Sequence, residues 1–170
     1  MPDLDFSIEP QQQDQWCWAA VAISICRFCG DQRWAKQCDL VNEIFAPIRG
    51  SDDCCQDGKS TNCNMPWALD IVLNNAKHLV QPTRGVVTFD DIDQQLTTHQ
   101  KPIAIRLMLS DLVTAHFIVV IGSAQTADGT QWVRVADPST STDNIHTIPY
   151  SALLNNYRPG AVWDQSYFTT

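Results

Sequence analysis

The segment QQQDQWCWAA, residues 11–20, contains the feature on which the fold prediction depends. It leads into a run of mostly apolar and small residues from Trp16 to Phe28, which Gly30 ends. Such a run is typical of a buried helix, and Cys17 stands in its first turn. Free backbone N–H groups and the helix dipole stabilise a thiolate at that position, so we expect a lowered pKa for Cys17. Cys17 is therefore a candidate nucleophile, and the alternatives are a disulfide partner or a buried structural thiol.

The chain has 170 residues, of which 44% are hydrophobic and 18% charged, which suits one domain with a hydrophobic core rather than a disordered segment. Its net charge of -8 argues against a nucleic acid or an anionic membrane as partner, since both attract Lys and Arg. The apolar runs are much shorter than the roughly 20 residues that span a bilayer. We therefore predict a single domain over residues 1–170 that is monomeric and binds neither nucleic acid nor membrane.

Helical patterns fill the first half of the chain, and strand patterns fill the second. Helices are predicted over 16–28, 32–45, 66–76 and 89–96, with Asn64 as cap of the third and a Thr88–Asp91 capping box at the fourth. Strands are predicted over 102–109, 116–122, 132–138 and 145–149 and in the C-terminal WDQSYFTT, with a short helix near SALLNNY. This order indicates an α+β fold, in which a helical half over about 1–100 packs on an antiparallel β-rich half over about 101–170.

The strands over 116–122 and 132–138 are predicted to form a hairpin, because Asp128-Gly129 between them is a turn signal. If the turn is centred between residues 126 and 127, His116 lies directly opposite Asp137 at the open end of an apolar ladder. An imidazole beside a carboxylate is the usual arrangement of a general base and the acid that orients it. A core histidine with satisfied hydrogen bonds is the alternative for His116. The other histidines have no such partner in the pattern.

All seven cysteines lie within the first 63 residues. Six can pair and leave one free thiol with a function, so the disulfide candidates are Cys26, Cys29, Cys38, Cys54, Cys55 and Cys63. Cys54 and Cys55 are neighbours, so we expect each to reach a separate partner: Cys38, Cys63 or the first helix. A zinc site built on these six cysteines, starting from the Cys26–Cys29 pair, is the alternative. The prediction is disulfides, with no metal and no cofactor.

The stretch QQQDQWCWAA resembles the active-site segment of papain-like cysteine proteases, in which a Cys-Trp-Ala sequence opens the central helix. The later motifs HFIVVIG and VADP also fit, and they are most similar to a bacterial branch of effector proteases and peptidase domains of bacteriocin-exporting transporters. The resemblance implies that Cys17 is the nucleophile, that His116 is its base and that Asp137 orients the histidine by accepting from Nδ1–H. It also implies that Gln11, six residues before the nucleophile, forms the oxyanion hole with the Cys17 N–H.

Trp16 and Trp18 flank the nucleophile and are candidates to line the substrate cleft or to shield the site from water. Two features depart from the plant enzymes of the family. Those enzymes have a Cys-Gly pair before the nucleophile and Asn as third member, where this chain has Gln15-Trp16 and Asp137. The chain is also shorter, so their substrate-pocket residues have no safe counterpart here.

The resemblance implies a hydrolase that cuts a peptide bond of a protein or peptide substrate by acyl transfer. The same triad serves deamidases, transglutaminases and peptidoglycan amidases, and the non-enzyme alternative is a binding module stapled by disulfides or zinc. The resemblance further suggests a bacterial effector or toxin domain, which cuts after small residues such as a Gly-Gly pair and has a cognate immunity protein. No signal-peptide pattern opens the chain. We therefore expect secretion by another route with action in a recipient cell, or otherwise a cytoplasmic location.

Overall fold

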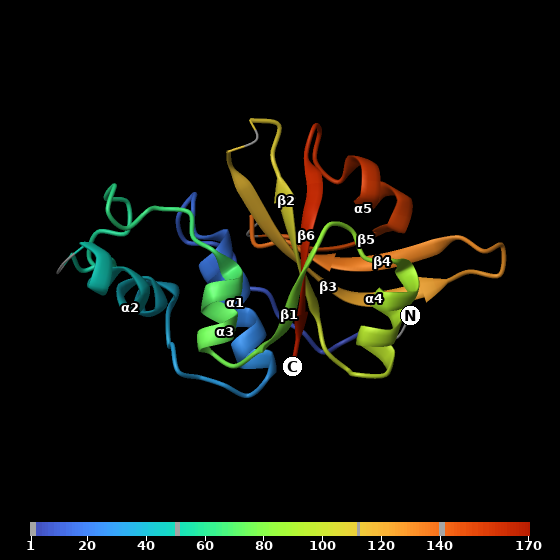
Figure 1. The fold of residues 1–170 in the computed structure, drawn as a ribbon, viewed down its shortest axis with the longest axis horizontal. Helices are drawn as coiled ribbons and strands as arrows, with labels where there is room; N and C mark the ends of the chain where they lie inside the picture. The colour runs from blue at the N-terminus through green and yellow to red at the C-terminus, as the bar shows by residue number, and fades with distance from the viewer. Residues whose placement is uncertain (1–2, 50–51, 112, 140–141) are drawn as a thin grey trace.

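The computed structural model describes residues 3–49, 52–111, 113–139 and 142–170, and within them it places five helices around one six-stranded sheet (Figure 1). The helices are α1 (Cys17–Phe28), α2 (Gln37–Arg49), α3 (Leu69–Asn75), α4 (Phe89–Thr97) and α5 (Tyr150–Asn156). Figure 1 shows α1, α2 and α3 gathered to one side of the sheet, with α4 and α5 at the other. The α+β class predicted from the sequence is confirmed. No helix in this part of the chain is long and apolar enough to cross a membrane.

The sheet has the strand order β1-β6-β2-β3-β4-β5, and every neighbouring pair is antiparallel. Its strands are β1 (Leu79–Arg84), β2 (Ile103–Met108), β3 (Ala115–Gln125), β4 (Gln131–Ala136), β5 (Ile145–Pro149) and β6 (Val162–Thr169). The sequence patterns predicted every strand except β1. That strand contains Pro82, which argues against a strand, but β1 lies at the sheet edge, where a missing N–H is tolerated.

The central strand β3 has a buried face on each side of the sheet. Phe117 and Val119 belong to the cluster that contains α1, whereas Ile118 and Val120 belong to the cluster that contains α4. Because side chains alternate along a strand, a strand covered on both faces has an uninterrupted apolar sequence. This double burial explains the run FIVVI and brings the beginning of β3 beside α1.

Helix α1 is buried from Cys17 to Cys26, so no polar face is needed and none appears in its sequence. The helix ends at Phe28, and Gly30 follows with a φ of +80°, a conformation that favours glycine. The Asp31 N–H donates to the Cys26 carbonyl across this turn. The helix therefore lies centrally in the molecule and holds its first residue, Cys17, in a fixed position.

Two helices begin later than predicted. Helix α2 begins at Gln37 rather than residue 32, because the Asp39 carboxylate accepts from the Lys36 N–H and caps the first turn there. It also continues through Pro47, which the pattern read as a stop. Helix α3 begins at Leu69 rather than residue 66. The predicted cap, Asn64, instead uses its side-chain oxygen to accept from the Gln15 N–H.

The predicted capping box at α4 is confirmed. The Thr88 hydroxyl accepts from the Asp91 N–H at 3.1 Å, and the Asp91 carboxylate accepts from the Thr88 N–H at 3.1 Å. An aspartate thus does the work for which glutamate is usual, and it satisfies two free donors at the helix start.

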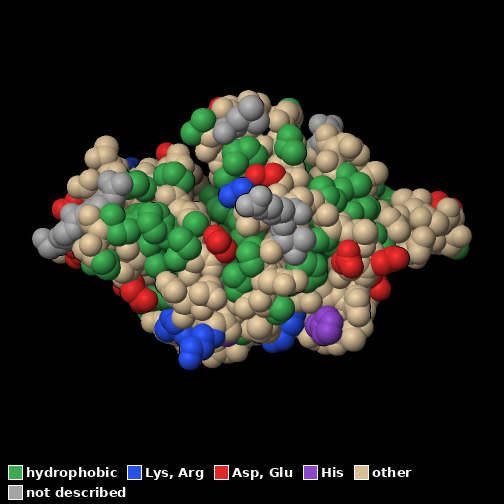
Figure 2. All heavy atoms as spheres, viewed as in Figure 1, with side chains coloured by type: hydrophobic (Ala, Val, Ile, Leu, Met, Phe, Trp, Pro, Cys, Tyr) green, Lys and Arg blue, Asp and Glu red, His purple; other side chains and the backbone are tan. Residues whose placement is uncertain are grey.

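The face of the molecule in Figure 2 carries hydrophobic side chains over the α2–α3 side, with acidic groups between and around them. Ile48 of α2 and Ile71 of α3 are 54% and 45% exposed. Acidic groups on this face are in keeping with a chain whose net charge is -8.

Candidate active site

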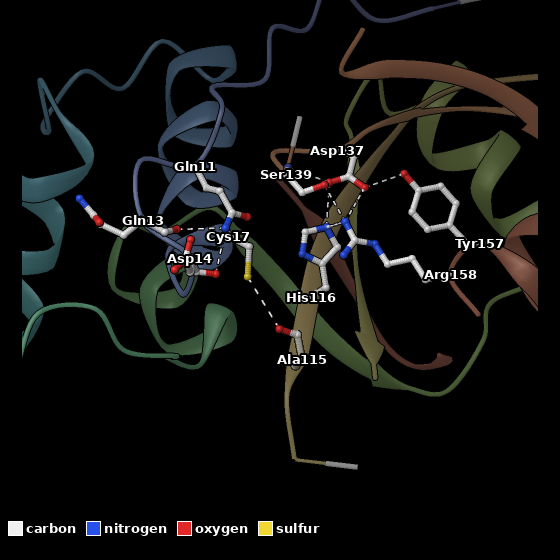
Figure 3. A network of polar contacts seen from close by, with 10 residues as sticks. All are labelled: Gln11, Gln13, Asp14, Cys17, Ala115, His116, Asp137, Ser139, Tyr157 and Arg158. Carbon is white, nitrogen blue, oxygen red and sulfur yellow. Dashed lines mark hydrogen bonds and ion pairs between the residues drawn. The ribbon is translucent and has the colours of Figure 1, made fainter. Parts of the chain in front are cut away.

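The thiol of Cys17 lies where α1 meets the beginning of β3. Its Sγ is 3.8 Å from the carbonyl oxygen of Ala115, the residue that opens β3 and precedes His116 (Figure 3). Within the described part of the chain, this carbonyl, and not His116, is the acceptor for the thiol. The side chain is buried, with 5% of the residue exposed. The nucleophile candidate and the base candidate, 99 positions apart in the sequence, are thus brought to one junction.

Burial raises the pKa of Cys17 from 9.0 to about 11, the opposite of the predicted direction. The N–H groups of Phe117 and Trp18 and the charge of Arg158 lower it, but they do not outweigh the loss of solvation. The prediction considered the helix end alone, and it is wrong because the site is closed to water. Cys17 therefore rests as a thiol at neutral pH and needs a base to take its proton.

His116 and Asp137 form the predicted contact. The His116 Nε2 is 2.8 Å from the Asp137 Oδ1, and the two residues are only 5% and 4% exposed. The ring nitrogen differs from the one we predicted, because the carboxylate meets Nε2 and not Nδ1. Nδ1 is therefore the nitrogen left to serve the thiol. The catalytic role of all three residues stays a prediction.

The hairpin register that led to this contact is wrong. Val120 pairs with Val135, whereas the predicted register placed Val120 opposite Val133. A bulge between Val120 and Gly122 shifts the pairing. With the observed pairing continued, Asp137 lies two positions from the residue opposite His116. Because side chains alternate with a period of two, this slip keeps both side chains on one face.

The Asp137 carboxylate is saturated with donors. Oδ1 also accepts from the Ser139 N–H at 2.9 Å, and Oδ2 accepts from the Tyr157 hydroxyl at 2.9 Å and from Arg158 Nη2 at 3.2 Å (Figure 3). Burial alone would raise the pKa of Asp137, but the hydrogen bonds from His116 and Ser139 and the charge of His116 hold it well below its usual range. Asp137 is therefore an anion that can hold the imidazole in place.

Tyr157 and Arg158 were not predicted as site residues. They follow α5, and Arg158 Nη2 also lies 3.0 Å from His116 Nε2 and 2.6 Å from Ser139 Oγ. Burial and the neighbouring Asp137 raise the pKa of Tyr157, so its hydroxyl stays a donor. The sequence run NNYRPG has no motif for this role, and only the return of α5 to the sheet reveals it.

Gln11 lies beside Cys17 in Figure 3, as the resemblance implied. Its amide group donates to the Gln13 carbonyl at 3.0 Å and to the Asp14 carbonyl at 2.9 Å. Its Oε1 is buried with no partner among the described residues. Both amide hydrogens are therefore occupied at rest, and one has to turn away before it can serve an oxyanion.

Trp16 and Trp18 do not line a cleft, so that prediction is wrong. They are 1% and 0% exposed, and their indole N–H groups donate to the carbonyls of Cys63 and Met65 at 2.8 and 2.9 Å. Both rings fasten the loop that ends at residue 65 to the first turn of α1. Tryptophan flanks the nucleophile because it combines a large apolar ring with a donor for a buried carbonyl.

Four of the six cysteines predicted to pair do so. Cys38 is bonded to Cys55 and Cys54 to Cys63, so the two neighbours reach separate partners as expected. Cys26 and Cys29 carry free thiols, and the expectation that all six would pair is wrong for these two. Both lie at the C-terminal end of α1, away from the loop that the disulfides fasten.

The two disulfides also remove four of the six ligands of the alternative zinc site. The sulfur of Cys26 does lie within 4.8 Å of ligand atoms of Asp31 and His78. However, the Asp31 oxygen that meets His78 at 3.2 Å also accepts from Arg33 at 2.8 Å, so a guanidinium already occupies it. This cluster is an ion-pair network, and it gives His78 a partner that the sequence did not reveal.

No protein-family model and no curated protein matches the chain. Among solved structures, the chain is similar to a double-glycine motif protease from an AMS/PCAT transporter, solved in complex with the leader peptide. The two share 13% identity over 98% of this chain and 92% of that chain, with a TM-score of 0.52. The chain is also similar to the bromelain protease of Ananas comosus in complex with the E64 inhibitor, with 12% identity over 96% of this chain, 93% of that chain and a TM-score of 0.47.

Both neighbours are cysteine proteases, and at these identities the first of them carries a conclusion about the fold alone. The helices beside an antiparallel sheet, with a cysteine opening the central helix, agree with it. The chain has the papain-like α+β fold.

Proposed function

We propose that the chain is a cysteine peptidase, with Cys17 as nucleophile, His116 as base and Asp137 as the orienting acid. One observation supports this most directly. The thiol at the start of α1 lies against the residue before His116, whose far ring nitrogen is bonded to a buried carboxylate. Nucleophile, base and orienting group thus follow in the order that covalent acyl transfer requires.

The proposed reaction uses the free nitrogen of His116. Nδ1 takes the thiol proton as Sγ bonds to the carbonyl carbon of the substrate, and the imidazolium is held by Asp137. The same proton then passes to the leaving amine as the C–N bond breaks, which leaves a thioester on Cys17. Water, deprotonated by His116, cleaves the thioester and releases the acid product. Because the pKa of Cys17 is raised, proton transfer accompanies attack, and no standing thiolate is needed.

The experiment that tests this function compares wild type with Cys17→Ala on a mixture of whole bacterial proteins. New N-termini are labelled and identified by mass spectrometry, and wild type is expected to create a set that shares a sequence around the cut. Cys17→Ala is expected to create none of them. If release of ammonia appears without new N-termini, the chain is a deamidase with the same triad and not a peptidase.

The predicted oxyanion role of Gln11 gives a second test. Gln11→Ala is expected to lower kcat by about 10²-fold, the usual cost of one oxyanion donor, with little change in the free energy of unfolding. Gln12→Ala is the matched control, since Gln12 donates through its backbone to the Gln37 side chain. The assignment fails if the loss follows Gln12 or Gln13 and not Gln11.

The biological setting proposed here goes further. One structural neighbour is described as a double-glycine motif protease bound to a leader peptide. On that likeness we include peptides with small residues before the cut, such as Gly-Gly, among the first substrates to try. Delivery as a bacterial effector or toxin, action in a recipient cell, a cognate immunity protein and a monomeric state stay predictions. Slower growth of bacteria that express wild type, compared with Cys17→Ala, would support toxicity.

A further inference from the structure

A cavity of about 340 Å³ lies beside the proposed triad, between β5 and the residues that follow α5. Its polar lining comes from Asp137, Ser139, His146, Tyr157 and Arg158, and β5 and α5 supply apolar side chains. Cys17 and His116 do not line it. The cavity is therefore separate from the reacting atoms but shares Asp137 and Arg158 with them.

The carboxylate in this cavity has no capacity left for a ligand. Asp137 accepts from His116 and the Ser139 N–H through one oxygen, and from Tyr157 and Arg158 through the other. Its negative charge is thus already compensated. The groups that still have hydrogens to offer are donors, which makes the cavity suited to an anion.

Arg158 is the strongest of these donors. A turn holds its backbone, since the Ala161 N–H donates to the Arg158 carbonyl at 3.0 Å and Gly160 has a φ of +73°. Its side chain is 32% exposed, and its recorded contacts all use Nη2. Within the described residues, Nε and Nη1 have no partner. A guanidinium with free N–H groups at a cavity wall binds a carboxylate readily.

The present position of Arg158 conflicts with the work proposed for His116. Nε2 of an imidazole carries either a proton or a lone pair. The contact with Asp137 at 2.8 Å needs the proton, whereas the contact with Arg158 at 3.0 Å needs the lone pair. If Arg158 donates, the ring proton moves to Nδ1, and Nδ1 can no longer accept the proton of Cys17. Arg158 therefore competes with Asp137 for the histidine and favours the inactive tautomer.

We propose that this cavity is a subsite for a carboxylate of the substrate, and that binding it to Arg158 frees His116 for Asp137. The proposal rests on the proposed peptidase function. His116 delivers its proton to the leaving amine, so the leaving segment lies on the histidine side of the thiol, where Figure 3 also places Arg158. The carboxylate is thus an acidic side chain or the free C-terminus, within the first residues after the cut.

The first test uses a peptide that wild type cuts, made with Asp or Asn after the cut and with a free or amidated C-terminus. Wild type is expected to favour one carboxylate by roughly 10-fold to 100-fold in kcat/KM, the effect of one charge-assisted hydrogen bond. The arm that shows the preference identifies the source of the carboxylate. Arg158→Gln is expected to erase the preference and to cut the neutral peptide at least as fast as wild type.

Arg134→Gln is the matched control, because Arg134 pairs with Asp3 away from the site. It is expected to keep the wild-type preference. An unchanged preference in Arg158→Gln overturns the proposal. Equal loss on charged and neutral peptides also overturns it, because Arg158 would then only support Asp137.

The second test does not depend on peptidase activity. Imidazole ¹⁵N chemical shifts of His116 report which ring nitrogen carries the proton, and they are measured with acetate or its neutral analogue acetamide at constant ionic strength. Acetate is expected to move wild type toward the Nε2–H tautomer, and acetamide is not. Arg158→Gln is expected to show that tautomer without any addition. Signals of wild type that ignore acetate overturn the carboxylate subsite, whereas absence of cleavage with these shifts present overturns only the peptidase.

Discussion

Cys17→Ala and His116→Ala are each expected to lower kcat/KM for peptide cleavage by on the order of 10⁵-fold, because members of such a triad act as one unit. Without Sγ no thioester forms, and without His116 the thiol, whose pKa is about 11, keeps its proton. The double variant is expected to be no slower than either single one. Cleavage of a quenched fluorescent peptide, followed to long times, measures the loss.

Matched controls separate chemistry from folding. Cys26→Ala removes another buried free thiol from the same helix, and His99→Ala removes an exposed histidine. Both are expected to retain activity within a few-fold of wild type. All four variants should give folded proteins by circular dichroism. Residual activity within tenfold of wild type in Cys17→Ala or His116→Ala would refute the assignment.

Trp18→Ala is expected to lower the free energy of unfolding by about 3–5 kcal/mol, the usual cost of truncating a buried tryptophan. Trp18 is fully buried, its ring lies 5.9 Å from that of Phe45, and its N–H donates to the Met65 carbonyl. Chemical denaturation measures the loss. The KM of the fraction that stays folded is expected to match wild type.

Trp18→Phe keeps an aromatic ring but removes the donor, so it isolates the unpaired Met65 carbonyl at a cost of about 1–3 kcal/mol. The order Ala, then Phe, then wild type in rising stability is the expected result. A raised KM with unchanged stability would instead return Trp18 to the substrate cleft.

The elements that pack the core were predictable from sequence, because burial leaves a local pattern. Helix α1 and strand β3 are continuous apolar runs, and the Thr88–Asp91 cap is visible in the letters themselves. The α+β class follows from their order. Strand β1 could not be predicted in this way, because its place at the sheet edge, which makes Pro82 tolerable, is a property of the assembled sheet.

The candidate site was predictable in its members but not in its geometry. Gly122 was read as the end of a strand, although it lies inside β3 at a bulge. A Cβ at Gly122 would collide with the Asp3 carboxylate, so the glycine admits the N-terminal segment rather than ending the strand. The contact of His116 with Asp137 survives because the register error is even.

Two further properties depend on contacts between distant segments. The pKa of Cys17 is set by burial against β3, and a helix considered alone gives the wrong direction. Arg158 comes from the opposite end of the chain to Cys17. No local pattern marks a residue whose partners, His116 and Ser139, belong to other strands and loops.

The disulfide-fastened loop has a practical consequence for assays. A thiol enzyme is ordinarily kept in millimolar dithiothreitol, which protects the nucleophile from oxidation. Here the same reagent attacks Cys54–Cys63, whose backbone carbonyl at Cys63 holds the Trp16 ring next to Cys17. Activity is therefore expected to rise and then fall as reductant increases. A buffered glutathione mixture, rather than an excess of dithiol, is the medium in which to purify and measure this protein.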